Sequence, residues 1–130
     1  MLIVALTIFV MQGCSFSTAN LSSLETFKDK DGKDKTTSFK AGDTIYGKAT
    51  ISNNPGKVKV NFSLADPKGK AISGANVSVD LDKNMNVATY SPPIPPKIED
   101  GTYKLTADMI NEAGEKKDSK TTDLTLTGGS

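Results

Sequence analysis

The chain has 130 residues, of which 36% are hydrophobic and 24% are charged, and this composition is typical of one globular domain. Its 16 basic residues are all lysine and face 15 acidic residues, so a net charge of +1 gives no reason to expect capture of nucleic acid. Histidine, arginine and tryptophan are absent, which excludes nucleophiles activated by histidine, metal sites built on imidazole and two-pronged binding of phosphate by arginine.

The amino-terminal segment is apolar and short. Residues 1–11 read MLIVALTIFVM, with Thr7 as the one polar side chain. A membrane span needs ~20 apolar residues, so this run instead has the length of the hydrophobic region of a secretory signal. It is followed by Gly13 and Cys14, and Cys14 is the single cysteine of the chain, so it forms no internal disulfide. The Gly13-Cys14 junction resembles the lipobox of bacterial lipoproteins, in which a small residue precedes the cysteine that is lipidated.

This resemblance implies that the protein is exported and then anchored to a membrane. Residues 1–13 are then a signal peptide that is removed, and Cys14 becomes the acylated first residue of the mature protein. Ser15 after the cysteine implies the outer membrane of a Gram-negative bacterium, on its periplasmic or its surface face. Residues 14–23, rich in serine, threonine and asparagine, are expected to form a flexible tether. The alternative is a buried amino-terminal strand with an ordinary core cysteine.

From residue 24 onward, apolar and polar residues alternate with a period of two. Val58, Val60, Phe62 and Leu64 show the pattern most clearly, and it recurs over residues 75–81 and 103–109. Such alternation indicates strands with one buried face. Turns rich in glycine, proline, asparagine and aspartate separate the runs. The sequence therefore predicts an all-β antiparallel sandwich of about seven to eight strands over residues 24–127, followed by a flexible end at 128–130.

Residues 24–30 and 117–127 are the candidates for exposed sheet edges.

A tyrosine near the start of the penultimate strand indicates which kind of sandwich is formed. Asp100-Gly101-Thr102-Tyr103 resembles the tyrosine corner of immunoglobulin-like and fibronectin-like sandwiches, where the hydroxyl bonds to nearby backbone. Residues 101–116, GTYKLTADMINEAGEK, look like the last two strands of bacterial immunoglobulin-like domains. The resemblance implies an immunoglobulin-like β-sandwich that lacks the disulfide pair and the core tryptophan of antibody domains.

Four prolines fall within one five-residue segment. Its members are Pro92, Pro93, Ile94, Pro95 and Pro96. Proline fixes an extended path and removes backbone donors. One interpretation is a docking ligand for an aromatic-lined groove of a partner. The interpretation that we favour is a stiff crossover between the two sheets, with Ile94 against the edge of the core.

The acidic residues give no sign of a metal or catalytic site. Residues 29–34 alternate aspartate with lysine around a glycine, but the twelfth position of a calcium loop would be Lys40 and the flanks read as strands. We expect a solvated hairpin tip. Two further acidic pairs lie beside turns: Asp80 with Asp82, and Glu99 with Asp100. We expect them to be solvated, and therefore expect neither catalysis nor a cofactor.

These observations predict a membrane-tethered, non-catalytic interaction or structural module of the bacterial envelope, with another envelope protein as its partner. The lysines are spread along the chain, so no stripe for nucleic acid is expected. A carbohydrate-binding module is one alternative, and it would need Tyr46 and Tyr90 on a common exposed face. An inhibitor or exclusion lipoprotein is another, with residues 91–97 as its projecting loop.

Overall fold

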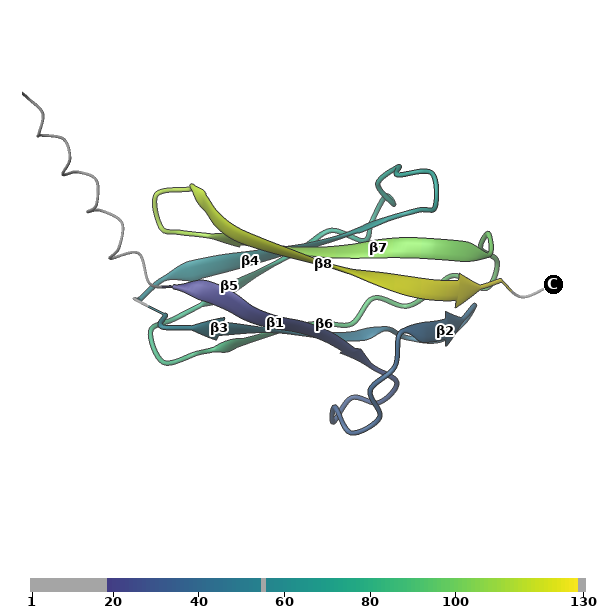
Figure 1. Cartoon of the computed structure of the whole chain (residues 1–130), viewed down its shortest axis with the longest axis horizontal. Helices are drawn as coiled ribbons and strands as arrows, with labels where there is room; N and C mark the ends of the chain where they lie inside the picture. Colours follow the sequence, from purple (N-terminus) through teal and green to yellow (C-terminus); the bar gives the residue numbers. More distant parts are fainter. Residues whose placement is uncertain (1–18, 55, 129–130) are drawn as a thin grey trace, which may run out of the picture.

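A computed structural model describes residues 19–54 and 56–128, and the elements in these ranges are all strands (Figure 1). The strands are β1 (Asn20–Phe27), β2 (Ser38–Lys40), β3 (Tyr46–Ser52), β4 (Val58–Ala65), β5 (Val77–Leu81), β6 (Val87–Tyr90), β7 (Gly101–Ile110) and β8 (Lys116–Thr127). Within this part of the chain no helix has the length and hydrophobicity that crossing a membrane requires. The signal segment and the acylation site expected at Cys14 lie outside the described residues.

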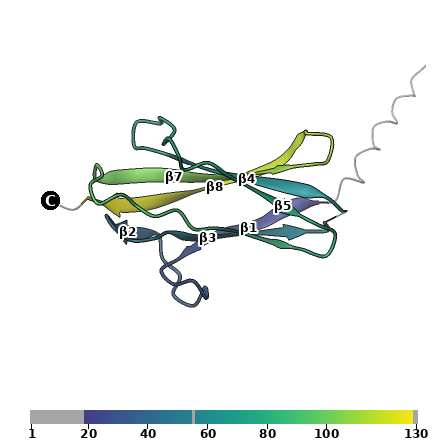
Figure 2. The same cartoon turned by 180° about the vertical axis from the view of Figure 1, so that it is seen from behind.

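The strands form two sheets that face each other (Figures 1 and 2). The smaller sheet has the order β1-β3-β6 and the larger one the order β2-β8-β7-β4-β5. Neighbouring strands are antiparallel except β2, which runs parallel to β8 over residues 38–40. The chain is therefore the all-β sandwich that the alternation predicted, and of the immunoglobulin-like class that the resemblance of residues 100–116 implied.

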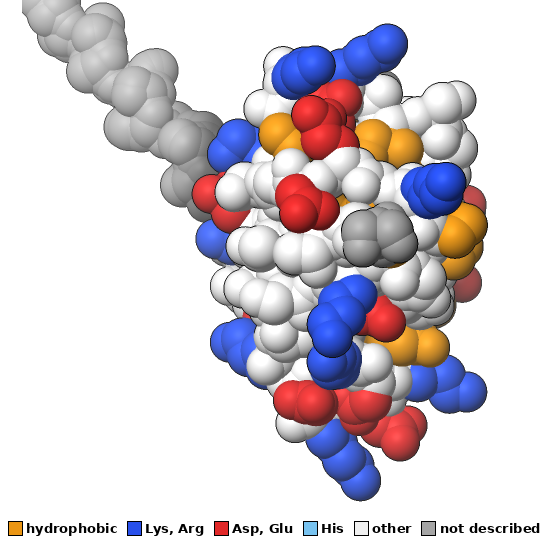
Figure 3. Space-filling model, turned by 90° about the vertical axis from the view of Figure 1, so that its right-hand side faces the viewer, with side chains coloured by type: hydrophobic (Ala, Val, Ile, Leu, Met, Phe, Trp, Pro, Cys, Tyr) orange, Lys and Arg blue, Asp and Glu red, His pale blue; other side chains and the backbone are white. Residues whose placement is uncertain are grey.

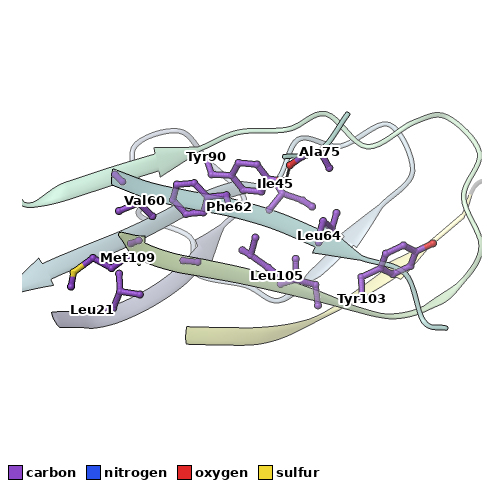
Figure 4. Packing of buried hydrophobic residues seen from close by; sticks show 14 of the residues in the cluster. Leu21, Ile45, Val60, Phe62, Leu64, Ala75, Tyr90, Tyr103, Leu105 and Met109 are labelled. Atoms are coloured by element: carbon purple, nitrogen blue, oxygen red, sulfur yellow. Dashed lines mark hydrogen bonds between the residues drawn. The ribbon is translucent and has the colours of Figure 1, made fainter. Parts of the chain in front are cut away.

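The core lies between the sheets and takes alternate residues from the strands. On β4, Val58, Val60, Phe62 and Leu64 are all buried, while the residues between them are not. The Phe62 ring stacks on the Tyr90 ring of the opposite sheet, with centroids 4.8 Å apart and planes 7° apart (Figure 4). Such contacts between apolar faces are the main source of the sandwich's stability.

The first strand begins earlier than predicted. β1 starts at Asn20 and buries Leu21, whose N–H donates to the Asp118 carboxylate at 2.8 Å. Residues 20–23 therefore belong to the sandwich and not to the tether. β1 also ends at Phe27, three residues before the predicted end, because residues 28–35 turn away into a loop.

The two predicted edges differ in how far they are exposed. β1 is an edge of the smaller sheet, as predicted. Residues 117–127 were the other candidate edge, and this prediction is wrong for residues 125–127, where β2 pairs with β8. A three-residue strand paired to a segment 87 positions away carries too little local pattern to be seen in sequence.

The sandwich has two dissimilar ends. We call the end with the short connections at residues 53–57, 82–86 and 111–115 the turn end, and β1 enters there because Asn20 pairs with Ser52. We call the opposite end, with the connections at residues 66–76 and 91–100, the loop end. At the turn end, the Asn54 side-chain amide donates to the backbone oxygens of Asp82 and Met85 at 2.9 and 2.8 Å.

Candidate functional site

The loop end holds an apolar cleft of about 330 Å³, which we call the end cleft. Its floor consists of four buried core residues: Ile45, Leu64, Tyr103 and Leu126. One wall comes from the connection between β4 and β5 and the other from the connection between β6 and β7. Figure 3 looks onto the loop end, where apolar side chains show among charged ones.

The proline segment forms one wall of the end cleft. It leads from β6 in the smaller sheet to β7 in the larger one, and Ile94 is 5% exposed, so the predicted crossover with Ile94 against the core is confirmed. The Ile94 N–H donates to the Asp43 oxygen at 2.7 Å, and the Ile94 oxygen accepts from Gly42 at 3.1 Å. The Pro92 oxygen accepts from the N–H of Ile45 at 3.1 Å.

These bonds fix the segment along the connection before β3, so it does not project as a free loop. Pro93 and Pro95 also line the end cleft, while Pro96 is exposed and does not. Since Ile94 is buried, it is not available as the inserted side chain of a docking ligand. The segment therefore acts as a wall of a cleft, and not as the occupant of one.

The opposite wall is held by residues that the sequence did not single out. Asp66 closes its turn by accepting the N–H groups of Lys68 and Lys70, each at 2.9 Å. Farther along, the Tyr90 hydroxyl donates to the Ala75 oxygen at 2.5 Å (Figure 4). Burial raises the pKa of Tyr90 to about 12, so at neutral pH its hydroxyl is a protonated donor that ties this wall to the core.

Tyr103 makes the contact expected of a tyrosine corner. Its hydroxyl donates to the backbone oxygen of Glu99 at 2.6 Å, and its ring lies in the floor of the end cleft. Burial, followed by the charges of Glu99 and Asp66, raises the pKa of Tyr103. The carboxylates of Glu99 and Asp66 are the charged groups among the described lining residues, and no lysine lines the end cleft.

The turn before Tyr103 requires glycine. Gly101 has a φ of +154°, and a Cβ added there would lie 2.6 Å from Cγ of Pro67. Only glycine meets both the backbone geometry and the close approach. Pro67 of one wall connection therefore lies close against the first residue of β7.

The aromatic platform expected for a carbohydrate module is not formed. Tyr90 is 1% exposed, and it pairs with Gly47 on the inner face of the smaller sheet. Tyr46 is the next residue along β3 and therefore lies on the outer face. The two rings therefore do not share the common exposed face that a carbohydrate module would need. Ala88, two residues before Tyr90, points to the same inner face.

Of the acidic candidates, Glu99 lines the end cleft, while Asp29, Asp80 and Asp82 do not. Asp29 accepts the N–H groups of Lys33 and Asp34 at 2.9 and 2.8 Å, and the bond from Asp34 contributes most to lowering the pKa of this carboxyl. Asp80 and Asp82 line a hollow of about 380 Å³ at the turn end, together with two lysines and the buried Val58 and Leu81. Across the described ranges, no group of three or more metal-ligating side chains is placed to hold a metal ion.

The comparisons with known proteins found similarity in structure only. No family model matches the sequence, and no curated protein is similar enough to it to count as a relative. A family 76 glycoside hydrolase from a bovine Bacteroides thetaiotaomicron strain matches 81% of the chain with a TM-score of 0.52 and 15% identity. A Bifidobacterium dentium β-glucuronidase, complexed with coumarin-3-O-glucuronide, matches 83% with a TM-score of 0.56 and 16% identity.

A CARDB domain from Pyrococcus furiosus, in complex with di-metal ions, aligns with 86% of the chain at a TM-score of 0.46 and 14% identity, and 93% of that domain is covered. The chain spans only 20% of the glycoside hydrolase and 18% of the glucuronidase. At such identities the two enzymes show a shared fold and nothing about activity, because one sandwich serves many functions.

Proposed function

We propose that the chain is a bacterial lipoprotein whose sandwich is tethered to the outer membrane through acylated Cys14 and acts as a non-catalytic protein-binding module of the envelope. The observation that carries this proposal is the placement of the end cleft. β1 enters at the turn end, whereas the cleft opens at the loop end. The ten residues of β7 span the distance between these ends, about 33 Å at ~3.3 Å per residue.

The tether is short under this proposal. Between Cys14 and the start of β1 at Asn20 lie residues 15–19, which reach at most about 17 Å when extended. The acyl chains supply the membrane affinity. The turn end then faces the bilayer and the end cleft faces away from it, toward other proteins of the envelope.

The chemistry of the end cleft supports binding and not a reaction. The Tyr103 hydroxyl is bonded to the Glu99 oxygen, and Asp66 is bonded to backbone N–H groups. Neither arrangement pairs a nucleophile with a base, which acyl or glycosyl transfer requires. The remaining lining is largely aliphatic, and such a surface contributes affinity by leaving water.

Intact cells that express the full chain with a carboxy-terminal tag test the proposal. We expect a membrane-bound protein whose amino-terminal peptide carries acylated Cys14, and cross-linking that joins it to one envelope protein. Cys14→Ser is expected to release it from the membrane. An unmodified Cys14 in a protein that stays in the soluble fraction contradicts the tether. An acylated protein without a specific protein neighbour contradicts the interaction role.

A further inference from the structure

The end cleft has a volume at the lower limit of typical ligand sites, which occupy ~300–1,000 Å³. Its floor is the exposed end of the hydrophobic core. Ile72 and Ile98 extend this apolar surface upward on the two walls, and both side chains are only partly buried. The cleft therefore suits an aliphatic side chain that enters from outside and completes the packing.

The rim favours positive charge and hydrogen-bond donors. Glu99 and Asp66 contribute carboxylates, and no ion pair is recorded for either within the described part of the chain. Along the proline wall, the prolines have no N–H, and the N–H of Ile94 is already bonded to Asp43. The Pro92 and Ile94 oxygens of this wall already accept bonds from Ile45 and Gly42, so the polarity of the rim comes from the two carboxylates.

We infer that the end cleft binds a polypeptide segment of a partner protein by taking up an aliphatic side chain flanked by lysine or arginine. The apolar floor takes the aliphatic group, and the Glu99 and Asp66 carboxylates accept bonds from the cationic neighbours. An anionic ligand meets two carboxylates, so it is disfavoured. This inference rests on the proposed function, since it names the chemistry of the partner.

Three blocked pentapeptides test this chemistry: one has leucine between two lysines, one has leucine between two glutamates, and one has serine between two lysines. Each is titrated into the isotope-labelled full chain carrying Cys14→Ser, and amide NMR shifts are followed. We expect the lysine-leucine peptide to shift the signals of Ile72, Ser73 and Glu99. The other two peptides are expected to bind at least several-fold more weakly. Equal binding of all three, or no shift at the end cleft, overturns the inference.

Matched variants separate the two contributions. Ile98→Ser is expected to weaken the lysine-leucine peptide about tenfold, since apolar contact area is lost. Glu99→Gln is expected to weaken it roughly three-fold, because an exposed ion pair contributes little. Met85→Ser and Glu112→Gln alter exposed residues of the turn end and serve as controls that leave affinity unchanged. Equal effects at both ends contradict the assignment to the end cleft.

The outcomes also separate the inference from the proposed function. An envelope protein that cross-links in cells while the peptides do not bind leaves the function in place and overturns the partner chemistry. Peptide binding by a protein that is neither acylated nor cross-linked in cells has the opposite meaning, because the cleft chemistry stands and the envelope role fails.

Discussion

The turn end and the loop end of the sandwich close the same core in different ways. At the turn end, connections of a few residues cap the strands with polar groups, as where Asn54 joins two turns through the oxygens of Asp82 and Met85. At the loop end, the longer connections stand apart as walls, and the core residues Leu64 and Leu126 form the floor of a cleft. The comparison teaches that both ends leave core residues at a hollow, but the turn end surrounds its hollow with lysines and carboxylates, whereas the longer connections of the loop end leave a largely apolar one.

Each wall of the end cleft is also fixed by a hydrogen bond from a core tyrosine. The Tyr90 hydroxyl anchors one connection at Ala75, and the Tyr103 hydroxyl anchors the other at Glu99. Each bond joins a core ring to a loop backbone, which limits the freedom of the loop to collapse over the floor. An open but fixed cleft loses less conformational entropy when a ligand binds.

The largest expected effect compares two isoleucines. Ile51 is 2% exposed in β3 near the turn end, whereas Ile94 is 5% exposed and lines the end cleft. We expect Ile51→Ala to lower the free energy of unfolding by about 4 kcal/mol, because it leaves a closed cavity, and Ile94→Ala by about 2 kcal/mol, because it widens an existing cleft. Urea denaturation measures both. Equal losses of unfolding free energy in the two variants would contradict the difference between the two ends.

Two glycines with positive φ give the next effect. Gly101 faces Pro67, while Gly114 at the turn end has a φ of +89° and open space where a Cβ would stand. We expect Gly114→Ala to cost about 1 kcal/mol from backbone strain alone, and Gly101→Ala about 3 kcal/mol because strain and overlap add. Thermal and urea unfolding of the two variants check this difference. A cost at Gly101 no larger than that at Gly114 would mean that Pro67 shifts to make room for the added methyl group.

The raised pKa of Tyr90 predicts that the protein loses stability at alkaline pH. Burial raises its pKa from 10.0 to about 12, so the folded state holds this proton over a range in which the unfolded state has released it. The contribution is fully present below pH 10 and is lost as the pH rises through about 12, to the extent of about 3 kcal/mol. Urea unfolding across this range measures it. Tyr90→Phe, which has no ionisable group there, is expected to flatten the extra pH dependence.

Tyr103→Phe has the smallest expected effect. It removes the hydroxyl bond to the Glu99 oxygen and should lower the free energy of unfolding by about 1 kcal/mol. Tyr46→Phe is the matched control, since this ring is part of the outer face of β3, and we expect no change there. An unfolding midpoint that is unchanged by Tyr103→Phe would remove the corner as a support of the loop end.

Local pattern predicted most of the fold. The alternation from Val58 to Leu64 reports the side-chain direction of a strand residue by residue, so β4 and β7 were found close to their observed bounds. The burial of Ile94 was predicted correctly, because it is the single aliphatic side chain among four prolines in the connection between the two sheets. The early start of β1 was missed, because Leu21 is a single apolar residue in a polar run.

The candidate site was only half visible in the sequence. The proline wall carries its own composition signal, but the opposite wall depends on the Tyr90 hydroxyl reaching Ala75, which is a tertiary contact. The inward direction of Tyr90 was also missed, since a four-residue strand such as β6 has too few positions for alternation to fix which face is buried.

A site-resolved cross-link tests the central claim most directly. A photoreactive phenylalanine derivative is placed either at position 73, on the exposed wall of the end cleft, or at position 112, in the exposed turn between β7 and β8. In intact cells, we expect position 73 to yield one adduct with an envelope protein that is lost with Ile98→Ser, and position 112 to yield none. Equal adducts from both positions, or none from position 73 in an acylated protein, would contradict a partner-binding cleft at the loop end.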